Sequence, residues 1–213
     1  MKSIILTVTL FVTLSSTLFA TSTYGNRHKG YFVSKSHLHY IFNRVKRTTN
    51  VSQKALAKTF AYYEEYRYKK HLSPDYIAIA DYTKPATQKR LYVINLHTGK
   101  VNRHLVAHGK NSGSRWGRVW HSSNKIGSNM TPYGFFKVGT KEGVTFKKHY
   151  RYLSIEGLEW KNRNAKKRDI LLHTAAYVNW NGRSYGCFAI RPEDRWSVFS
   201  KLKRALLYSY TGR

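Results

Sequence analysis

The hydrophobic and polar positions of the chain follow a helical period in the first third and short strand-like runs after it. Residues 37–47 and 52–70 carry apolar side chains at intervals of three and four, as on one face of a helix. Ser52 precedes a run of good helix formers and suits an N-cap. The sequence therefore predicts two helices, which end ahead of the Ser-Pro-Asp turn at residues 73–75.

Beyond this turn, short runs of β-branched and aromatic residues predict strands. The runs occupy residues 76–82, 90–96, 100–109, 134–140, 151–157 and 169–175. An amphipathic stretch at 193–204 predicts a helix near the C-terminus, and residues 205–210 suit a last strand that closes the sheet. The expected fold is mainly β (α+β): one β-rich domain with an N-terminal helical extension.

The first twenty residues predict a secretory signal peptide. Lys2 leads into an apolar run from Ile4 to Phe19, and Ala20 offers a small residue at the cleavage point. The run is short and no stop-transfer charges follow it at once, which favours a signal peptide over the alternative, an uncleaved anchor. Either way, the rest of the chain faces an oxidising space outside the cytoplasm, and no transmembrane segment is expected after signal removal.

The net charge says little about the fold but much about partners. The chain has 38 Lys and Arg against 10 Asp and Glu, a formal charge of +28, which becomes +27 when Lys2 leaves with the signal peptide. Nucleic acid is the usual partner of so basic a protein, but an exported protein rarely meets it. We therefore expect anionic envelope polymers instead: peptide stems with free carboxylates, acidic glycans or phosphorylated lipids.

Cys187, the only cysteine, lies in the sequence Gly-Arg-Ser-Tyr-Gly-Cys-Phe-Ala-Ile. An odd cysteine in an exported chain is reactive, intermolecular or simply buried. A reactive thiol needs a base, and His173 ends a strand-like run whose polar, turn-rich continuation can return the chain beside it. Gly186 permits a sharp turn, with backbone N–H groups near Cys187 available to an oxyanion. On spacing alone, a catalytic pair and a structural pair both stay open.

The same residues resemble the motif of the L,D-transpeptidases, the YkuD-type cysteine enzymes of bacterial peptidoglycan, in which His-Gly-small precedes Ser-x-Gly-Cys. The similarity covers Tyr76 to Tyr210. It includes the segments DYTKPATQKRLYVINLHTGKV, VAHGKNSG and MTPYGFFKVG. The order of histidine before cysteine argues against papain-like and NlpC-type peptidases, where the cysteine comes first. The resemblance implies a YkuD-like β-sandwich or barrel, with residues 76–213 as the catalytic domain and 21–75 as leader and helical extension.

By resemblance, Cys187 is the nucleophile and His173 the general base. Ser184 and Gly186 would shape the turn around the thiol, with the backbone of Tyr185 and Gly186 near the oxyanion. The remaining candidates for the substrate cleft are His108, Gly109, Thr131, Arg183 and Arg191.

Three positions depart from the family pattern. Thr174 stands where the family usually has glycine, Tyr185 stands where many members have His or Trp, and Arg191 is displaced from the usual arginine position. For His108, a turn histidine without function is slightly favoured over a cleft residue. A rival hypothesis is therefore a non-catalytic, cationic envelope-binding protein on a degenerate transpeptidase scaffold.

The reaction implied by the resemblance is acyl transfer without a cofactor. Cys187 attacks the diaminopimelate carbonyl of a donor stem tetrapeptide and expels D-alanine, and the thioester then passes to an amine or to water. No metal is expected, because histidines elsewhere, such as His37 and His39, lack companion carboxylates at zinc-ligand spacing. The sequence does not fix the acceptor or the oligomeric state.

The signal-peptide prediction is open to direct test. We expect the mature protein to begin near Thr21 and to be found outside the cytoplasm, because the apolar run ends at that point. N-terminal sequencing of the protein from the envelope fraction checks this. An intact Met1 in that fraction would contradict cleavage.

Overall fold

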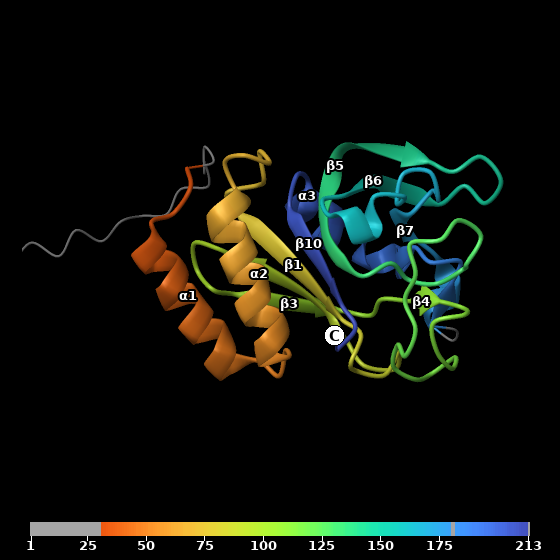
Figure 1. The fold of residues 1–213 in the computed structure, drawn as a ribbon, viewed down its shortest axis with the longest axis horizontal. Helices are drawn as coiled ribbons and strands as arrows, with labels where there is room; N and C mark the ends of the chain where they lie inside the picture. Colours follow the sequence, from red (N-terminus) through yellow and green to blue (C-terminus); the bar gives the residue numbers. More distant parts are fainter. Residues whose placement is uncertain (1–30, 180–181, 213) are drawn as a thin grey trace, which may run out of the picture.

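The computed structural model describes residues 31–179 and 182–212, so the expected signal peptide lies outside the described residues (Figure 1). The helices are α1 Lys35–Thr48, α2 Gln53–Tyr66 and α3 Arg195–Leu202. The strands are β1 Tyr76–Asp81, β2 Leu91–Asn95, β3 Val101–His104, β4 His108–Gly109, β5 Gly134–Val144, β6 Arg151–Gly157, β7 Leu171–Thr174, β8 Arg183–Ser184, β9 Phe188–Ile190 and β10 Leu206–Tyr210. Within the described residues, no helix is long and apolar enough to cross a membrane.

The two N-terminal helices form where the sequence predicts them. The Ser52 side chain accepts the Ala55 N–H at 3.4 Å and caps α2, which confirms its predicted role. Helix α1 buries Leu38, Ile41 and Val45, which lie at intervals of three and four residues and therefore share one face. The third predicted helix is also present, as α3.

Eight strands form one sheet in the order β3-β2-β1-β10-β5-β6-β7-β9, and β4 pairs with β8 in a separate two-stranded ladder. The mainly β fold expected from the sequence is confirmed. The last strand, β10, does not lie at an edge. It pairs in parallel with β1 and antiparallel with β5, at the centre of the sheet.

The sheet is covered by helices on one face, over the half that contains β1, β2 and β10 (Figure 1). The apolar faces of α1 and α2 pack there against strand residues such as Ile77, Ile79 and Leu206. The opposite face encloses a second core, which contains Phe136, Phe188 and apolar side chains of α3. The helical extension and the strands that follow it thus share a buried core.

Packing of α1 on the sheet can be tested by truncating one buried side chain. Ile41→Ala should lower the free energy of unfolding by about 2–5 kcal/mol, because it opens a cavity in a fully buried contact. Tyr40→Ala, at the neighbouring position that is 52% exposed, is the matched control and should change it by less than about 0.5 kcal/mol. Urea denaturation measures both. Equal losses would show that α1 does not contribute a specific contact.

Candidate active site

The parallel pairing of β7 with β9 brings His173 and Cys187 together. The register aligns Leu172 with Phe188 and His173 with Ala189. Leu172 and Phe188 point into the enclosed core, and side chains alternate along a strand. His173, one position after Leu172, and Cys187, one position before Phe188, therefore lie on the opposite face as diagonal neighbours. The strand return expected from the sequence is observed.

Cys187 is half-buried, and its environment favours the neutral thiol. The Sγ–H group donates to the Asp169 carbonyl oxygen at 3.3 Å. Burial raises the pKa of the thiol, and a backbone hydrogen bond from Leu171 and the positive charge of Arg168 oppose this only in part. Cys187 therefore rests as a thiol at neutral pH, and a base would be needed to ionise it.

His173 is held in the tautomer that such a base requires. Its Nδ1 lies 3.0 Å from the Thr174 carbonyl oxygen, which can only accept, so Nδ1 carries the proton and Nε2 has the free lone pair. The ring stacks on Tyr150 with centroids 5.1 Å apart and planes inclined by 10°. Burial lowers the pKa of His173, which keeps the imidazole neutral. Cys187 and His173 thus both rest uncharged.

The turn before Cys187 is locked by Ser184. Its Oγ donates to the Cys187 carbonyl oxygen at 2.7 Å and accepts the Gly186 N–H at 3.1 Å. Gly186 has φ +120°, and a Cβ there would lie 2.8 Å from the Met130 carbonyl oxygen. Only glycine fits this position. The Gly186 N–H donates within the turn, so it is not available to an oxyanion.

Arg168 adjoins the turn and was not singled out by sequence reasoning. Its guanidinium donates to Ser128 Oγ at 3.2 Å, to the Met130 carbonyl oxygen at 2.5 Å and to the Ser123 carbonyl oxygen. It also lies close to Gly186, where a Cβ would be 3.2 Å from one of its nitrogens. Arg168 therefore fixes the 123–130 loop beside the thiol. In the sequence it is one cation in a Lys-Lys-Arg-Asp run, which carries no sign of this role.

His108 is placed behind the cleft and not in it. The side chain is fully buried, Nδ1 accepts from the Arg90 guanidinium at 2.7 Å, and Nε2–H donates to the Ser114 carbonyl oxygen at 3.1 Å. Burial and the neighbouring charge of Arg90 lower the pKa of His108 to about 4. Both ring nitrogens are used, so the imidazole serves a structural contact.

Gly109 and Thr131 support the same region. The Gly109 N–H donates to Thr131 Oγ1 at 2.8 Å, and the Thr131 N–H donates to Ser112 Oγ at 2.8 Å. Gly109 also pairs with Ser184 in the β4–β8 ladder. Thr131 is fully buried. Together these contacts brace the turn that presents Cys187, without lining the cleft.

The two candidate arginines have different positions. Arg183 lines a cavity of about 350 Å³, together with Ser184 and Tyr185 of the turn before Cys187. Arg191 lies beyond the opposite end of β9 and pairs with Asp194 at 2.9 Å and Glu193 at 3.2 Å. Arg191 is therefore engaged in an ion-pair cluster outside this cavity.

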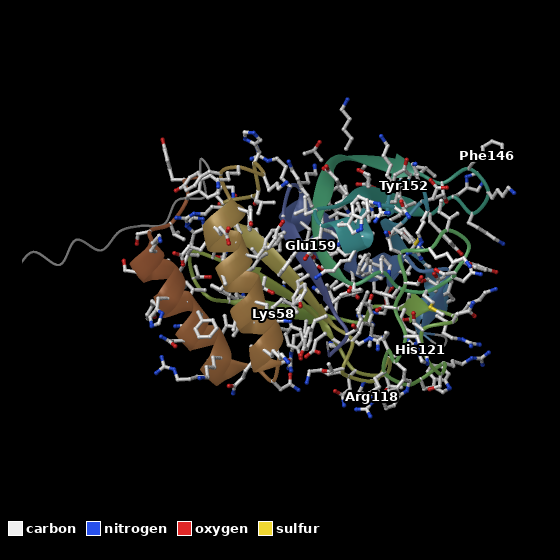
Figure 2. The ribbon with its side chains drawn as sticks, in the orientation of Figure 1. Lys58, Arg118, His121, Phe146, Tyr152 and Glu159 are labelled. Carbon is white, nitrogen blue, oxygen red and sulfur yellow. The ribbon has the colours of Figure 1, made fainter. Side chains whose placement is uncertain are left out.

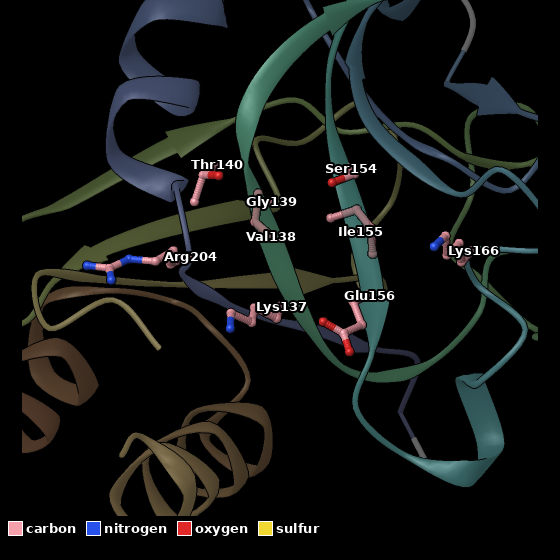
Figure 3. A pocket seen from close by; sticks show the side chains of 9 residues that line it. All are labelled: Lys137, Val138, Gly139, Thr140, Ser154, Ile155, Glu156, Lys166 and Arg204. Carbon is pink, nitrogen blue, oxygen red and sulfur yellow. The ribbon is translucent and has the colours of Figure 1, made fainter. Parts of the chain in front are cut away.

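The cavity next to Cys187 in the chain is the candidate substrate cleft. Tyr150 lines it and stacks on His173, and Ser184 and Tyr185 line it and lead into Cys187. Its full lining is Lys110, Lys148, Tyr150, Tyr177, Arg183, Ser184 and Tyr185. A larger cavity of about 570 Å³ is lined mainly by β5 and β6 (Figure 3). Neither lining includes His173 or Cys187, but only the smaller cavity is lined by residues that adjoin them.

Thr174, which replaces the glycine usual in the family, has a local function. Its Oγ1 accepts the Arg151 N–H at 3.2 Å, and its hydroxyl points to the Arg151 carbonyl oxygen at 3.4 Å. The side chain thus ties β7 to the start of β6. Its carbonyl oxygen meanwhile orients His173, so the substitution leaves the orienting contact intact.

The comparisons with known proteins agree with this geometry. A family model described as "L,D-transpeptidase catalytic domain" matches residues 47–210. The chain belongs to this family. L,D-transpeptidase domains act on cell-wall peptidoglycan, and the resemblance inferred from the motifs is confirmed.

Among solved structures, an L,D-transpeptidase from Xylanimonas cellulosilytica DSM 15894 is similar at 13% identity and a TM-score of 0.37, over 85% of this chain and 87% of that chain. None of the curated proteins matches.

The buried His108 predicts how stability depends on pH. Its pKa is about 4 in the folded L,D-transpeptidase domain and about 6.5 when unfolded, so the unfolded chain binds more protons between these values. The contribution of His108 to the free energy of unfolding is complete above about pH 6.5, and about 3 kcal/mol of it is lost as the pH falls to about 4. His173, whose pKa is also lowered, acts with the same sign.

Urea denaturation across this pH range measures the effect. The difference between the protein and its His108→Gln variant isolates His108, because His173 is common to both. The variant should be less stable at neutral pH and show a shallower loss toward acid. An unchanged slope in the variant would contradict a neutral His108.

Proposed function

We propose that the protein is a peptidoglycan L,D-transpeptidase in which Cys187 is the nucleophile and His173 the general base. The observation that carries the proposal is the β7–β9 register, which sets the thiol and an imidazole of defined tautomer on one face, next to a cleft. This is the arrangement that nucleophilic catalysis by cysteine requires. The family match supports the same chemistry.

In the first half-reaction, His173 Nε2 accepts the thiol proton as Cys187 Sγ attacks the diaminopimelate carbonyl carbon of a donor stem tetrapeptide. The new C–S bond gives a tetrahedral oxyanion. The imidazolium then donates its proton to the amine nitrogen of D-alanine, and the C–N bond breaks to leave a thioester. In the second half, His173 deprotonates an amine or a water, which attacks the thioester and releases the thiol.

Oxyanion stabilisation falls to backbone N–H groups of Tyr185 and Cys187, because the Gly186 N–H is donated to Ser184 Oγ. Ser184 contributes by holding the turn. Arg168 contributes a positive charge beside the sulfur, which favours the thiolate as it forms. The pKa of the thiol is raised and that of His173 is lowered, so proton transfer accompanies attack instead of preceding it as a stable ion pair.

The family's substrate and the predicted signal peptide both support a location of the proposed activity in the cell envelope. Residues 76–213 would form the catalytic domain, and the helices before them would extend it. The net charge of +28 suits contact with anionic envelope polymers.

The rival proposal is a non-catalytic envelope-binding protein on the same scaffold. A degenerate site would be expected to lose the orientation of the base or the turn around the thiol. Here His173 keeps an oriented Nδ1–H and Ser184 keeps both hydrogen bonds of the turn. These contacts support the enzyme over the binding protein.

The test is release of D-alanine from purified disaccharide-tetrapeptide, with intact mass to detect a thioester on Cys187. Cys187→Ala should abolish both, because a methyl group cannot attack a carbonyl and the sequence has no second cysteine. His173→Gln should slow acylation by about 10²–10⁴-fold. His39→Gln, the same change at an exposed position on α1, is the control and should leave the rate unchanged.

Product analysis identifies the acceptor: a dimer means cross-linking, a tripeptide monomer means hydrolysis, and a changed terminus means exchange of the D-amino acid. Folded, reduced protein that neither releases D-alanine nor forms a thioester would favour the binding protein.

A further inference from the structure

All the charged side chains that line the cleft beside Cys187 are basic. Three cations line it, Lys110, Lys148 and Arg183, and no acidic side chain does. Tyr150, Tyr177 and Tyr185 supply aromatic walls. Like charges gathered around one hollow repel one another unless an anion lies among them.

Arg183 has a buried polar atom that the described residues leave without a partner. Its Nε atom is buried and has no hydrogen-bond partner among the described residues. A buried polar group without a partner costs free energy that a bound acceptor can recover. The positive charge of Arg183 also acts on the protein interior, because it helps to lower the pKa of the buried His108. A guanidinium in this state suits a carboxylate, which it can bind through two parallel hydrogen bonds.

The two lysines flank Arg183 from different elements. Lys110 follows β4, and its Nζ lies 4.6 Å from the centroid of the Tyr185 ring. Lys148 lies on the loop between β5 and β6, which also carries Phe146, 92% exposed at the far end of the molecule (Figure 2). Neither lysine forms an ion pair within the described part of the chain. Neither ammonium group is therefore neutralised by a carboxylate of the described residues.

We propose that this cleft is a carboxylate-selecting subsite, in which Arg183, Lys110 and Lys148 hold free carboxylates of the acyl-donor peptide while the tyrosines pack on its aliphatic parts. The inference rests on the proposed function, because it concerns the donor of the same reaction. It adds a specificity: a donor whose side carboxylates are carboxamides keeps its shape but loses the charge that the three cations recognise. A charge-assisted hydrogen bond contributes about 1.5–3 kcal/mol, which corresponds to a tenfold or greater preference.

Binding tests the subsite apart from catalysis. Calorimetry on the Cys187→Ala protein compares disaccharide-tetrapeptide with its carboxamide analogue, and the free acid should bind about tenfold or more tightly. Lys110→Gln combined with Lys148→Gln should reduce this preference by about threefold or more, since only Arg183 of the three cations remains. Lys147→Gln is the matched control, an exposed lysine next to Lys148 that does not line the cleft, and should keep the full preference. Added salt should weaken the preference by screening.

Turnover by the protein with Cys187 intact distinguishes the proposed enzyme from the proposed carboxylate subsite. Amidation of the donor should raise KM and leave kcat nearly unchanged, because the carboxylates lie away from the reacting bond. Equal binding of the two donors to the Cys187→Ala protein, or a preference that the double lysine change leaves undiminished, would overturn the subsite. Absence of acylation with either donor, beside a retained binding preference, would overturn the enzyme and leave the carboxylate site standing.

Discussion

One buried guanidinium holds together the part of the fold on which the site depends. Arg90 is fully buried and donates to the carbonyl oxygens of Lys84, Val106 and Gly117 and to the imidazole of His108. Burial lowers the pKa of Arg90 to about 10, so it stays a cation without an acidic partner in hydrogen-bonding contact. Such a charge is tolerated only because its donors are satisfied. It thereby fixes the loop whose β4 strand braces the turn before Cys187.

The electrostatics of Cys187 and His173 protect the thiol from oxidation. Burial raises the pKa of Cys187 and lowers that of His173, so both groups rest uncharged. Oxidants attack the thiolate much faster than the thiol. A cysteine that rests as the thiol is therefore oxidised slowly. Arg168, whose positive charge favours the thiolate, opposes this protection in part.

The sequence predicts the local features of the fold, but it does not predict the roles of residues that depend on tertiary packing. The strand runs, the Ser52 cap and the pairing of a His173 strand with a Cys187 strand follow from periodicity and turn chemistry. The role of Arg168 does not, because one cation among 38 Lys and Arg has no local signature. The burial of His108 is equally hidden, since it depends on Arg90, which is distant along the chain and meets it only in the folded core.

The central position of β10 constrains how the chain can be made. The strand joins β1 to β5 in the middle of the sheet, although every other described strand precedes it in the chain. The two halves of the sheet therefore cannot unite until β10 has been made. Until then, β1 and β5 each keep an unpaired edge, which is open to wrong partners. Loss of β10 would divide the sheet into two parts instead of trimming its edge.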